Sequence, residues 1–210
     1  ELIKLFHAAG HSVTVLCRNS SAALAALKGV RVIENVHLDD SKSIRDAVQT
    51  LANTPIDILI NNAGILQRNT LEAACEDTTI DSIMAQFKTN ALGPVILTSA
   101  CMDQLKSGSK VICITSRMGS IADNSSGSHY GYRMSKAALN AASMSLSHDC
   151  RERGIAVGII HPGWIQTDMT GHTGNDTPET AAKQICERIE QLNLENSGTF
   201  WHANGDILAW

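Results

Sequence analysis

Short apolar runs rich in β-branched residues alternate along the chain with longer segments of helical periodicity. This alternation is typical of βαβ units built on a parallel sheet. The runs are hydrophobic almost throughout, which fits strands covered by helices on both faces. The predicted strands span 12–17, 30–36, 56–63, 110–116 and 155–163, and a terminal run at 198–210 predicts an edge strand.

The segments between these runs predict six helices, at 2–9, 21–27, 41–51, 80–105, 132–153 and 178–192. Asp40 or Ser41 can cap the third helix, and Gly154 can end the fifth. Thr177 followed by Pro178 opens the last helix in the preferred way. No repeat or linker is visible, so we expect one domain over residues 1–210. Its predicted fold is a three-layer, doubly wound α/β sheet of the Rossmann type.

The first predicted element is a helix with no strand before it. In an open parallel sheet of this type, the first strand usually lies in the middle, beside the point where the strand order reverses. Without it we expect a slot between strands that normally lie about 4.8 Å apart, with unpaired backbone groups facing the slot. The chain also begins with Glu1 rather than Met. We therefore expect the natural protein to extend upstream.

Composition narrows the class of protein. The 210 residues are 43% hydrophobic, which suffices for a well-buried core. The net charge is −4 and basic residues are scattered, so no nucleic-acid surface is predicted. No apolar run approaches the ~20 residues of a membrane span, and no signal peptide is visible. The six cysteines lack a C-x-x-C pair, so we expect buried, reduced thiols in a cytoplasmic protein and no metal site.

Tyr132 and Lys136 are the first candidates for chemistry. Four positions apart on the predicted helix 132–153, they lie on one face. A nearby ammonium stabilises phenolate and draws the tyrosine pKa down from ~10, which suits a general acid or base. Of the two tyrosines, only Tyr132 has a lysine four residues later. Taken alone, a tyrosine and a lysine at this spacing more often lie on a solvent-exposed helix face without a catalytic role.

Polar groups also follow three of the predicted strands, where parallel strands face a ligand crevice. Ser116 ends one strand and can hydrogen-bond a substrate carbonyl. Ala63 and Gly64, within Ile-Asn-Asn-Ala-Gly at 60–64, allow a flat ring to approach the backbone. The segment 161–167 offers a rigid turn, backbone donors and a hydroxyl that suit an amide. An ordinary turn would explain each of these equally well.

Asn90 interrupts the predicted helix 80–105. Asparagine is a poor residue for a helix interior because its side chain competes for backbone hydrogen bonds. A polar break at this position can hold a water or a lysine, whereas surface placement is the ordinary explanation for an isolated asparagine.

Together these motifs resemble the short-chain dehydrogenase/reductase family. The family order is found in Asn-Asn-Ala-Gly at 61–64, Asn90, Ser116-x-x-Gly119, Tyr132-x-x-x-Lys136 and Pro162-Gly163-x-x-x-Thr167. The resemblance covers essentially the whole chain. It is greatest to the small C-factor-like members, from the segments at 114–127 and 132–140 and the closing 205–210.

The resemblance implies an oxidoreductase that moves hydride between a nicotinamide and a small carbonyl or alcohol substrate. Tyr132 would exchange a proton with the substrate oxygen. Lys136 would lower the pKa of Tyr132 and bind the nicotinamide ribose. Ser116 would orient the carbonyl, and Asn90 would hold the water of a proton relay.

The resemblance also implies the remaining cofactor contacts and the assembly. Asp39, after the run at 30–36, resembles the family residue that contacts adenine. The other implied contacts are Asn62, Ala63 and Gly64, with Pro162, Gly163, Ile165 and Thr167 near the nicotinamide carboxamide. Such folds commonly form homodimers or homotetramers, and the small residues of 135–147 suit close helix packing.

The end of the first predicted strand bears on the choice of cofactor. NAD-preferring folds of this type usually place an acidic residue at the end of the second strand for the ribose 2′-hydroxyl. The strand predicted at 12–17 corresponds to that second strand. Here the stretch is Leu16-Cys17-Arg18-Asn19. No carboxylate is present to repel a 2′-phosphate, and Arg18 can pair with one. The sequence therefore predicts NADP(H) over NAD(H).

The sequence departs from the family pattern in two places. The interval from Ser116 to Tyr132 is longer than usual, which a loop at 121–129 can absorb. The glycine-rich turn that normally cradles the pyrophosphate is missing, so a chain starting at Glu1 should bind cofactor poorly.

Two other functions compete with the oxidoreductase. A non-catalytic signalling or partner-binding protein is one alternative. A nucleotide-sugar epimerase or dehydratase shares Tyr-x-x-x-Lys, but too few residues follow Lys136 for its substrate domain.

Overall fold

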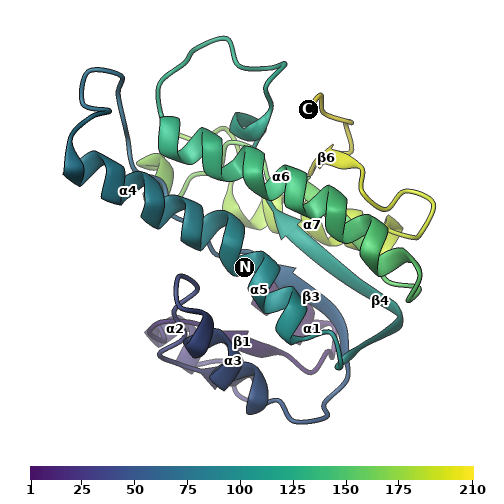
Figure 1. Ribbon diagram of the computed structural model, residues 1–210. Coiled ribbons are helices and arrows are strands. Elements are labelled where there is room, and N and C mark those ends of the chain that lie inside the picture. Colours follow the sequence, from purple (N-terminus) through teal and green to yellow (C-terminus); the bar gives the residue numbers. More distant parts are fainter.

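A computed structural model describes all 210 residues, and it forms parallel sheet strands covered by helices on both faces (Figure 1). The strands are β1 (Thr14–Leu16), β2 (Arg31–Ile33), β3 (Ile56–Asn61), β4 (Leu105–Ile114), β5 (Ala156–His161) and β6 (Phe200–His202). The helices are α1 (Leu2–Ala8), α2 (Ala22–Ala25), α3 (Ser41–Gln49), α4 (Asp77–Phe87), α5 (Gly93–Ala100), α6 (Tyr130–Arg151) and α7 (Pro178–Gln191). Three short turns complete the chain, the π-helical η1 (Lys88–Leu92) and the 3₁₀ turns η2 (Arg117–Gly119) and η3 (Asp168–Thr170). The predicted Rossmann-type α/β fold is confirmed.

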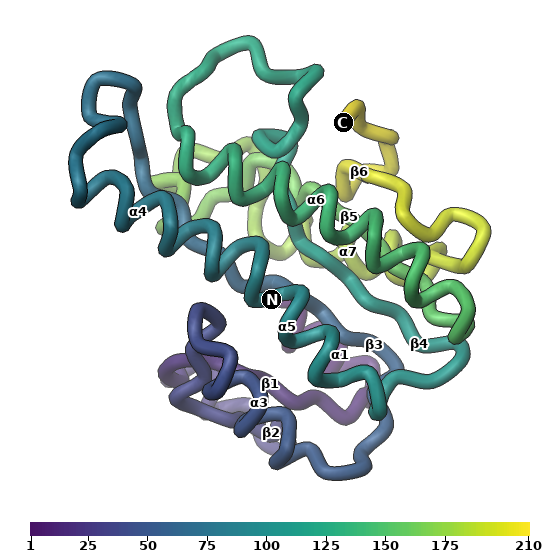
Figure 2. Tube along the Cα trace, viewed as in Figure 1, coloured from purple at the N-terminus to yellow at the C-terminus, as the bar shows by residue number.

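The sheet is divided into two parts. One part pairs β1 with β2, and the other has the order β3-β4-β5-β6, with all pairs parallel. β1 pairs only with β2 and β3 only with β4, so the edges of β1 and β3 have no hydrogen-bonded neighbour. Figure 2 shows the two-stranded part, in purple to dark blue, below the larger part, in which β3 is blue and the strands β4 to β6 run from teal to yellow. The division falls where the sequence predicts it.

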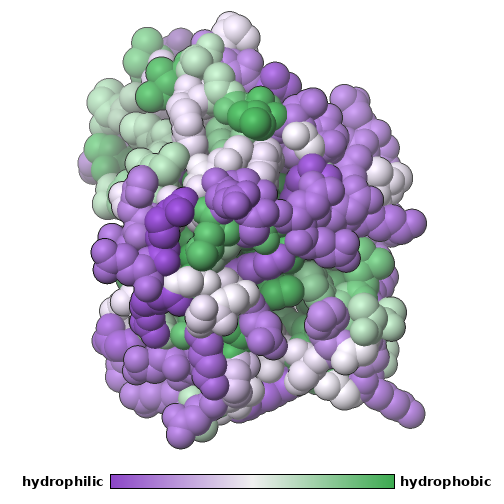
Figure 3. All heavy atoms as spheres, turned by 90° about the vertical axis from the view of Figure 1, so that its right-hand side faces the viewer, coloured by the Kyte–Doolittle hydropathy of each residue, from purple (hydrophilic) through white to green (hydrophobic).

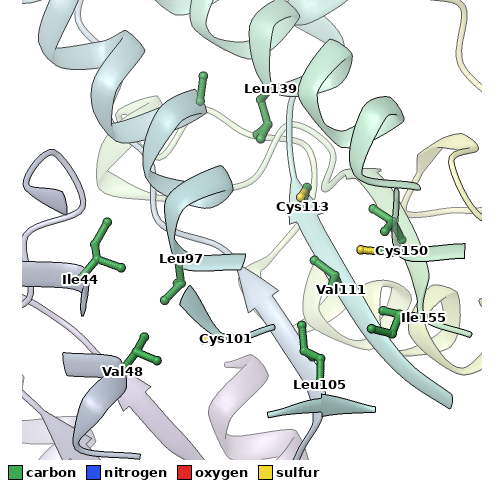
Figure 4. Close-up of a cluster of buried hydrophobic side chains, with 12 residues drawn as sticks. Ile44, Val48, Leu97, Cys101, Leu105, Val111, Cys113, Leu139, Cys150 and Ile155 are labelled. Carbon is green, nitrogen blue, oxygen red and sulfur yellow. The ribbon is translucent and has the colours of Figure 1, made fainter. Parts of the chain in front are cut away.

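Helix α3 joins the two parts through the larger core cluster (Figure 4). Ile44 and Val48 of α3 pack in this cluster with Leu97 of α5. Val111 of β4 and Leu139 of α6 belong to the same cluster. Since α5 and α6 cover the four-stranded part, the burial of Ile44 and Val48 attaches the two-stranded part to it.

A second cluster fills the opposite face of the sheet. Ile112 of β4 packs there with Ile185 and Ile189 of α7. Leu2 and Phe6 of α1 lie against the same cluster and are only partly buried. Successive residues of β4 thus face different helical layers, which explains why its sequence is apolar without alternation.

The predicted helix 80–105 is wrong at its middle and its end. It divides into α4, the π-helical turn η1 and α5, and the last of these ends at Ala100. Leu105 instead begins β4, where it pairs with Ile56 and is almost fully buried. The apolar residue that extended the helical pattern therefore belongs to the sheet core.

The predicted helix ends are largely confirmed. The Asp40 carboxylate accepts a hydrogen bond of 2.8 Å from the Lys42 N–H at the start of α3. The Thr177 hydroxyl accepts one of 3.2 Å from Thr180 N–H at the start of α7. Gly154 follows α6 with a φ of +70°, a conformation that favours glycine.

All six cysteines are free thiols, and Cys101, Cys113 and Cys150 are buried as expected. The expectation is wrong for Cys75, which is exposed on the loop before α4. Histidine, cysteine and acidic side chains nowhere gather in groups of three or more that could hold a metal ion. The helices include none with the length and apolar character needed to cross a bilayer.

Candidate active site

Ser116, Tyr132 and Lys136 meet at the carboxyl end of β4. Ser116 directly precedes η2, and its hydroxyl accepts a hydrogen bond of 3.1 Å from Met118 N–H. Tyr132 and Lys136 lie in the first two turns of α6, on the face toward the sheet. The exposed fractions are 7% for Ser116, 7% for Tyr132 and 3% for Lys136. Water therefore has little access to the three side chains.

Gly119 brings η2 into backbone contact with α6. A Cβ atom at this position would lie 2.7 Å from the carbonyl carbon of Lys136 and 2.9 Å from the nitrogen of Ala137. Both neighbours are main-chain atoms of a packed helix, so any larger residue would push the two elements apart. The close approach of the Ser116 turn to the Tyr132 helix therefore requires glycine.

The Lys136 ammonium is buried beneath the Tyr132 ring. Its Nζ donates a 2.9 Å hydrogen bond to the carbonyl oxygen of Ile114 and lies 5.9 Å from the ring centroid. Burial lowers the pKa of Lys136 to about 8. An ammonium has three N–H donors, and only one is used here. Two donors remain for a ligand rich in oxygen.

The sequence-based expectation for the Tyr132 pKa is wrong in this structure. Burial raises the pKa of the phenol, and contact with the Ser116 hydroxyl offsets this only in part. The Lys136 ammonium lies over the ring, 5.9 Å from its centroid, and donates to Ile114 O. Tyr132 is therefore a neutral phenol at neutral pH, and this is the form that donates a proton.

Asn90 lies in η1 and is fully buried, so the ordinary surface explanation does not apply. Its Oδ1 accepts from Ile65 N–H at 2.8 Å, and its Nδ2 donates to Ile65 O at 2.8 Å. Nδ2 also donates to the Ser135 hydroxyl at 3.0 Å. The amide thus holds the backbone after Gly64 and links it to α6, between Tyr132 and Lys136.

The Asn-Asn-Ala-Gly turn follows β3 and runs beside Lys136. A Cβ atom at Gly64 would lie 3.3 Å from Asn90 Oδ1 and 3.5 Å from Lys136 Nζ. Asn62 and Ala63 are exposed next to this contact. Asn61 belongs to the motif but was not a predicted cofactor contact, and its buried amide donates to Thr98 Oγ1 at 3.2 Å. Its inward position at the end of a buried strand was the available signal.

The segment after β5 is a folded loop. Gly163 has a φ of +98°, and Trp164 Nε1 donates to Thr173 O at 2.8 Å. Gln166 N–H donates to Asp176 O at 2.9 Å. Pro162, Gly163, Ile165 and Thr167 are all half-buried. The structure thus gathers these four predicted cofactor contacts into one loop, at the same end of the sheet as Ser116.

His161, the residue before this loop, was not among the predicted site residues. Burial lowers its pKa to about 3, and the neighbouring His202 contributes in the same direction. The two rings meet edge to face with centroids 4.9 Å apart. A histidine that ends a buried strand directly before Pro-Gly was the available signal. His161 is therefore a neutral side chain packed behind the loop.

Arg18 and Asp39 lie apart from the other candidates, in the two-stranded part. Arg18 follows β1, Asp39 follows β2, and both are exposed. Arg18 forms no ion pair, while the Glu34 carboxylate accepts a hydrogen bond of 2.5 Å from Ser20 N–H. The Arg18 guanidinium is therefore free to meet an anion.

Two cavities flank η2. One of about 170 Å³ lies between the residues after Ser116 and the C-terminal segment 207–209, and Arg117 and Asp123 form an ion pair at its wall. The other, of about 290 Å³, lies between η2 and α6 beside Met118 and Met134. Figure 3 shows that the face with the C-terminal strand is largely hydrophilic, with apolar surface gathered in its upper part. Neither cavity is lined by Tyr132 or Lys136.

The fold and the arrangement of these groups define an oxidoreductase built on a Rossmann-type sheet. A family profile described as short chain dehydrogenase matches residues 1–178. The chain belongs to the short chain dehydrogenase family, as the motif order predicts.

Relatives of known name agree with this assignment. The chain is 42% identical over 158 residues to C-signal of Myxococcus xanthus, covering 74% of this chain and 93% of that protein. It is 34% identical over 216 residues to 1-hydroxy-2-glutathionyl-2-methyl-3-butene dehydrogenase of Rhodococcus sp. strain AD45, covering 100% and 93%.

Solved structures share the fold. The NADPH-bound carbonyl reductase from chicken fatty liver superposes with a TM-score of 0.86 at 27% identity, covering 99% of this chain and 93% of that one. The carbonyl reductase Sniffer of D. melanogaster gives a TM-score of 0.87 at 28% identity, covering 100% and 93%.

Proposed function

We propose that the protein is an NADP(H)-dependent oxidoreductase that interconverts a small carbonyl compound and its alcohol, with Tyr132 as the general acid and base. The observation that carries the proposal is a buried phenol whose ring centroid lies 5.9 Å from the Lys136 ammonium, with the buried Ser116 hydroxyl on the adjoining turn η2. Buried ionisable groups with shifted pKa values concentrate at catalytic sites.

The residues present fit a dinucleotide. Lys136 has two unused N–H donors beside the Gly64 turn, where ribose hydroxyls find partners. Asn62, Ala63 and the loop of Pro162, Gly163, Ile165 and Thr167 would hold the nicotinamide end. Asp39 would contact the adenine, and Arg18 a 2′-phosphate. When bound, the cofactor supplies or accepts the hydride.

The proton transfer follows from the side chains of this chain. In carbonyl reduction the Ser116 hydroxyl donates a hydrogen bond to the carbonyl oxygen, and Tyr132 donates its proton to that oxygen. The Lys136 ammonium stabilises the phenolate left behind. General acid catalysis of this kind contributes about 10²- to 10⁴-fold in rate. Burial keeps the phenol protonated at neutral pH, which is the form that donates the proton in reduction.

The choice of NADP(H) is supported from two sides. Arg18 is exposed, free of ion pairs, and positioned at the carboxyl end of β1. The chicken carbonyl reductase that shares the fold at 27% identity is NADPH-bound. Both observations favour a cofactor that carries an additional phosphate.

The experiment is a comparison of two tyrosine variants in NADPH turnover across a panel of aldehydes and ketones. Tyr132→Phe should reduce turnover at least about 100-fold and leave NADPH binding near the wild-type value. Tyr130→Phe is the matched control, because it makes the same change two residues away and should retain turnover. Full activity in Tyr132→Phe would exclude the proposed acid.

A second candidate function is signalling or partner binding without turnover. The 42% identity to a protein named C-signal favours it. It predicts that NADPH binds while no carbonyl compound or alcohol in the panel is converted. The proposal for either function includes a homodimer or homotetramer, which the sedimentation of the purified protein would measure.

A further inference from the structure

The loop that follows the Gly64 turn is held by two side-chain amides one helical turn apart. Asn90 binds the N–H and carbonyl of Ile65, while Gln86 Oε1 accepts from Gln67 N–H at 3.0 Å. Gln86 Nε2 then donates to Asn69 Oδ1 at 2.9 Å. The two amides therefore hold alternate residues of the loop, Ile65 and Gln67.

Gln86 and Asn69 are an unusual pair to bury. Gln86 is 0% exposed and Asn69 is 4% exposed. Gln86 uses both ends of its amide, and Asn69 Nδ2 donates to Ser82 Oγ at 3.2 Å. A buried amide that loses its partner keeps the cost of desolvation without a hydrogen bond. The pair therefore has one low-energy arrangement, which we name the amide clamp.

The first turn of α6 rests on the amide clamp. No side chain caps this helix, and it is preceded by Ser128 and His129 in the left-handed conformation, with φ of 57° and 54°. Support comes from the clamp, since His129 N–H donates to Asn69 O at 2.9 Å. A Cβ atom at Gly131 would lie 2.5 Å from Gln86 Nε2 and 2.7 Å from Asn69 Oδ1. The backbone just before Tyr132 thus lies directly against both amides.

We infer that Gln86 and Asn69 are positioning residues for the Tyr132 phenol, and that they act through the His129 and Gly131 backbone. The inference rests on the proposed function for its catalytic meaning, since neither residue touches the reacting groups. The clamp fixes the start of α6 relative to η2, and hence the phenol relative to Ser116. Without the clamp, the first turn keeps the backbone bond to Asn69 O and the Arg133 bonds to Gly127 O and Ser128 O. It loses the two buried amides that pack against Gly131.

The test uses a background in which Tyr132 is the only tyrosine. The chain has two tyrosines, so Tyr130→Phe leaves one phenol whose ionisation can be followed directly by ultraviolet absorbance. Gln86→Leu in this background removes the amide at nearly constant volume. Gln104→Leu is the matched control, because Gln104 donates to Ala52 O between α5 and β4, at the opposite end of the sheet.

Gln86→Leu should shift the pKa of Tyr132, because that pKa depends on the burial of the phenol and on its contact with Ser116, and both change when the first turn of α6 moves. The same variant should lower kcat by about 10- to 100-fold with little change in the KM for NADPH. Gln104→Leu should change neither quantity. If Gln86→Leu shifts the melting temperature but leaves the phenol titration and kcat at the control values, the clamp is merely structural and the inference is wrong.

Asn69 provides a second, milder pair of variants should Gln86→Leu fail to fold. Asn69→Leu leaves Gln86 bonded to Gln67 N–H and should reproduce the shift in the titration. Asn69→Gln keeps an uncharged amide whose oxygen can accept the Gln86 N–H and should restore the titration toward the parent. Equal titrations in the two Asn69 variants would contradict the inference. A dependence of the titration on the clamp in a protein without turnover would support the positioning and refute only the proposed reaction.

Discussion

The strands β5 and β1 show how differently the two parts of the sheet are built. Every residue of β5 from Ala156 to Ile160 is buried, whereas β1 and β2 contain no buried residue. β5 lies between β4 and β6 with helices on both faces, while β1 has one strand neighbour. A strand paired on one side forms fewer ladder bonds and buries less apolar surface.

The candidate chemistry follows the same division. Ser116, Tyr132 and Lys136 belong to the four-stranded part, together with Asn90. The two-stranded part contributes only exposed candidates for cofactor contacts, and α3 attaches it through Ile44 and Val48. In the proposed reaction, proton transfer depends on the well-packed part, whereas the two-stranded part affects only how the cofactor is held.

The largest expected effect separates the two parts by kinetics. Ser116→Ala should lower kcat at least about 100-fold, because the carbonyl loses the donor that orients it. The KM for NADPH should stay near the wild-type value, since Ser116 is remote from the two-stranded part. Ser120→Ala changes another buried serine of the same loop and should retain turnover. A rise in the KM for NADPH without loss of kcat would show that Ser116 acts in cofactor binding and would contradict the division between the two parts.

The next largest effect is on the free energy of unfolding, compared between one isoleucine in each part of the sheet. Ile112 of β4 is 0% exposed, and Ile112→Ala should lower the free energy of unfolding by about 2–5 kcal/mol. Ile33 of β2 is only half-buried, so Ile33→Ala should cost less than half of that. Denaturant unfolding measures both. Equal losses would show that the two parts contribute alike to stability.

Lys136 gives the four-stranded part a dependence on pH. Its folded-state pKa of about 8 lies below the ordinary 10.5, so the unfolded chain binds more protons between these values. The free energy of unfolding should therefore rise across this window by up to ~1.4 kcal/mol per pH unit. Lys136→Met should remove that rise and stabilise the protein at neutral pH. The surface variant Lys183→Met should keep the wild-type pH dependence, and a slope retained in Lys136→Met would assign it to another group.

The smallest effect belongs to the two-stranded part. Arg18→Ala should raise the KM for NADPH about 10-fold, since an exposed pair with a phosphate contributes only modestly. kcat and the KM for NADH should change little. Arg45→Ala removes a surface arginine of α3 that is no proposed contact and serves as the control. An equal loss for both cofactors would show that Arg18 does not distinguish them.

Much of the fold follows from the apolar runs, because the central strands β4 and β5 are covered on both faces and their buried residues need no alternation. The ends of strands place Ser116 and Gly64 by the same logic. The π-helical turn at Lys88–Leu92 was not predictable, since it depends on how Asn90 meets Ile65 across the chain. The same holds for Gln86, whose polar side chain resembles a surface residue until its partners are known.

The sign of the Tyr132 pKa shift shows a different limit. The spacing to Lys136 predicts a charge nearby and hence a lower pKa. Spacing gives no information on burial, and burial is the largest cause of the Tyr132 pKa shift in this structure. A pair of residues on one helix face thus predicts proximity, while the surrounding elements decide its electrostatics.

Gly119 gives the site a mechanical property that no side chain supplies. Its turn and the helix of Lys136 touch main chain to main chain, so rotamer exchange cannot alter the separation of the two elements. In a saturation screen for activity, position 119 should tolerate no replacement, alanine included. The distance between η2, which carries Ser116, and α6, which carries Tyr132, is thus set by a residue whose side chain is a single hydrogen atom.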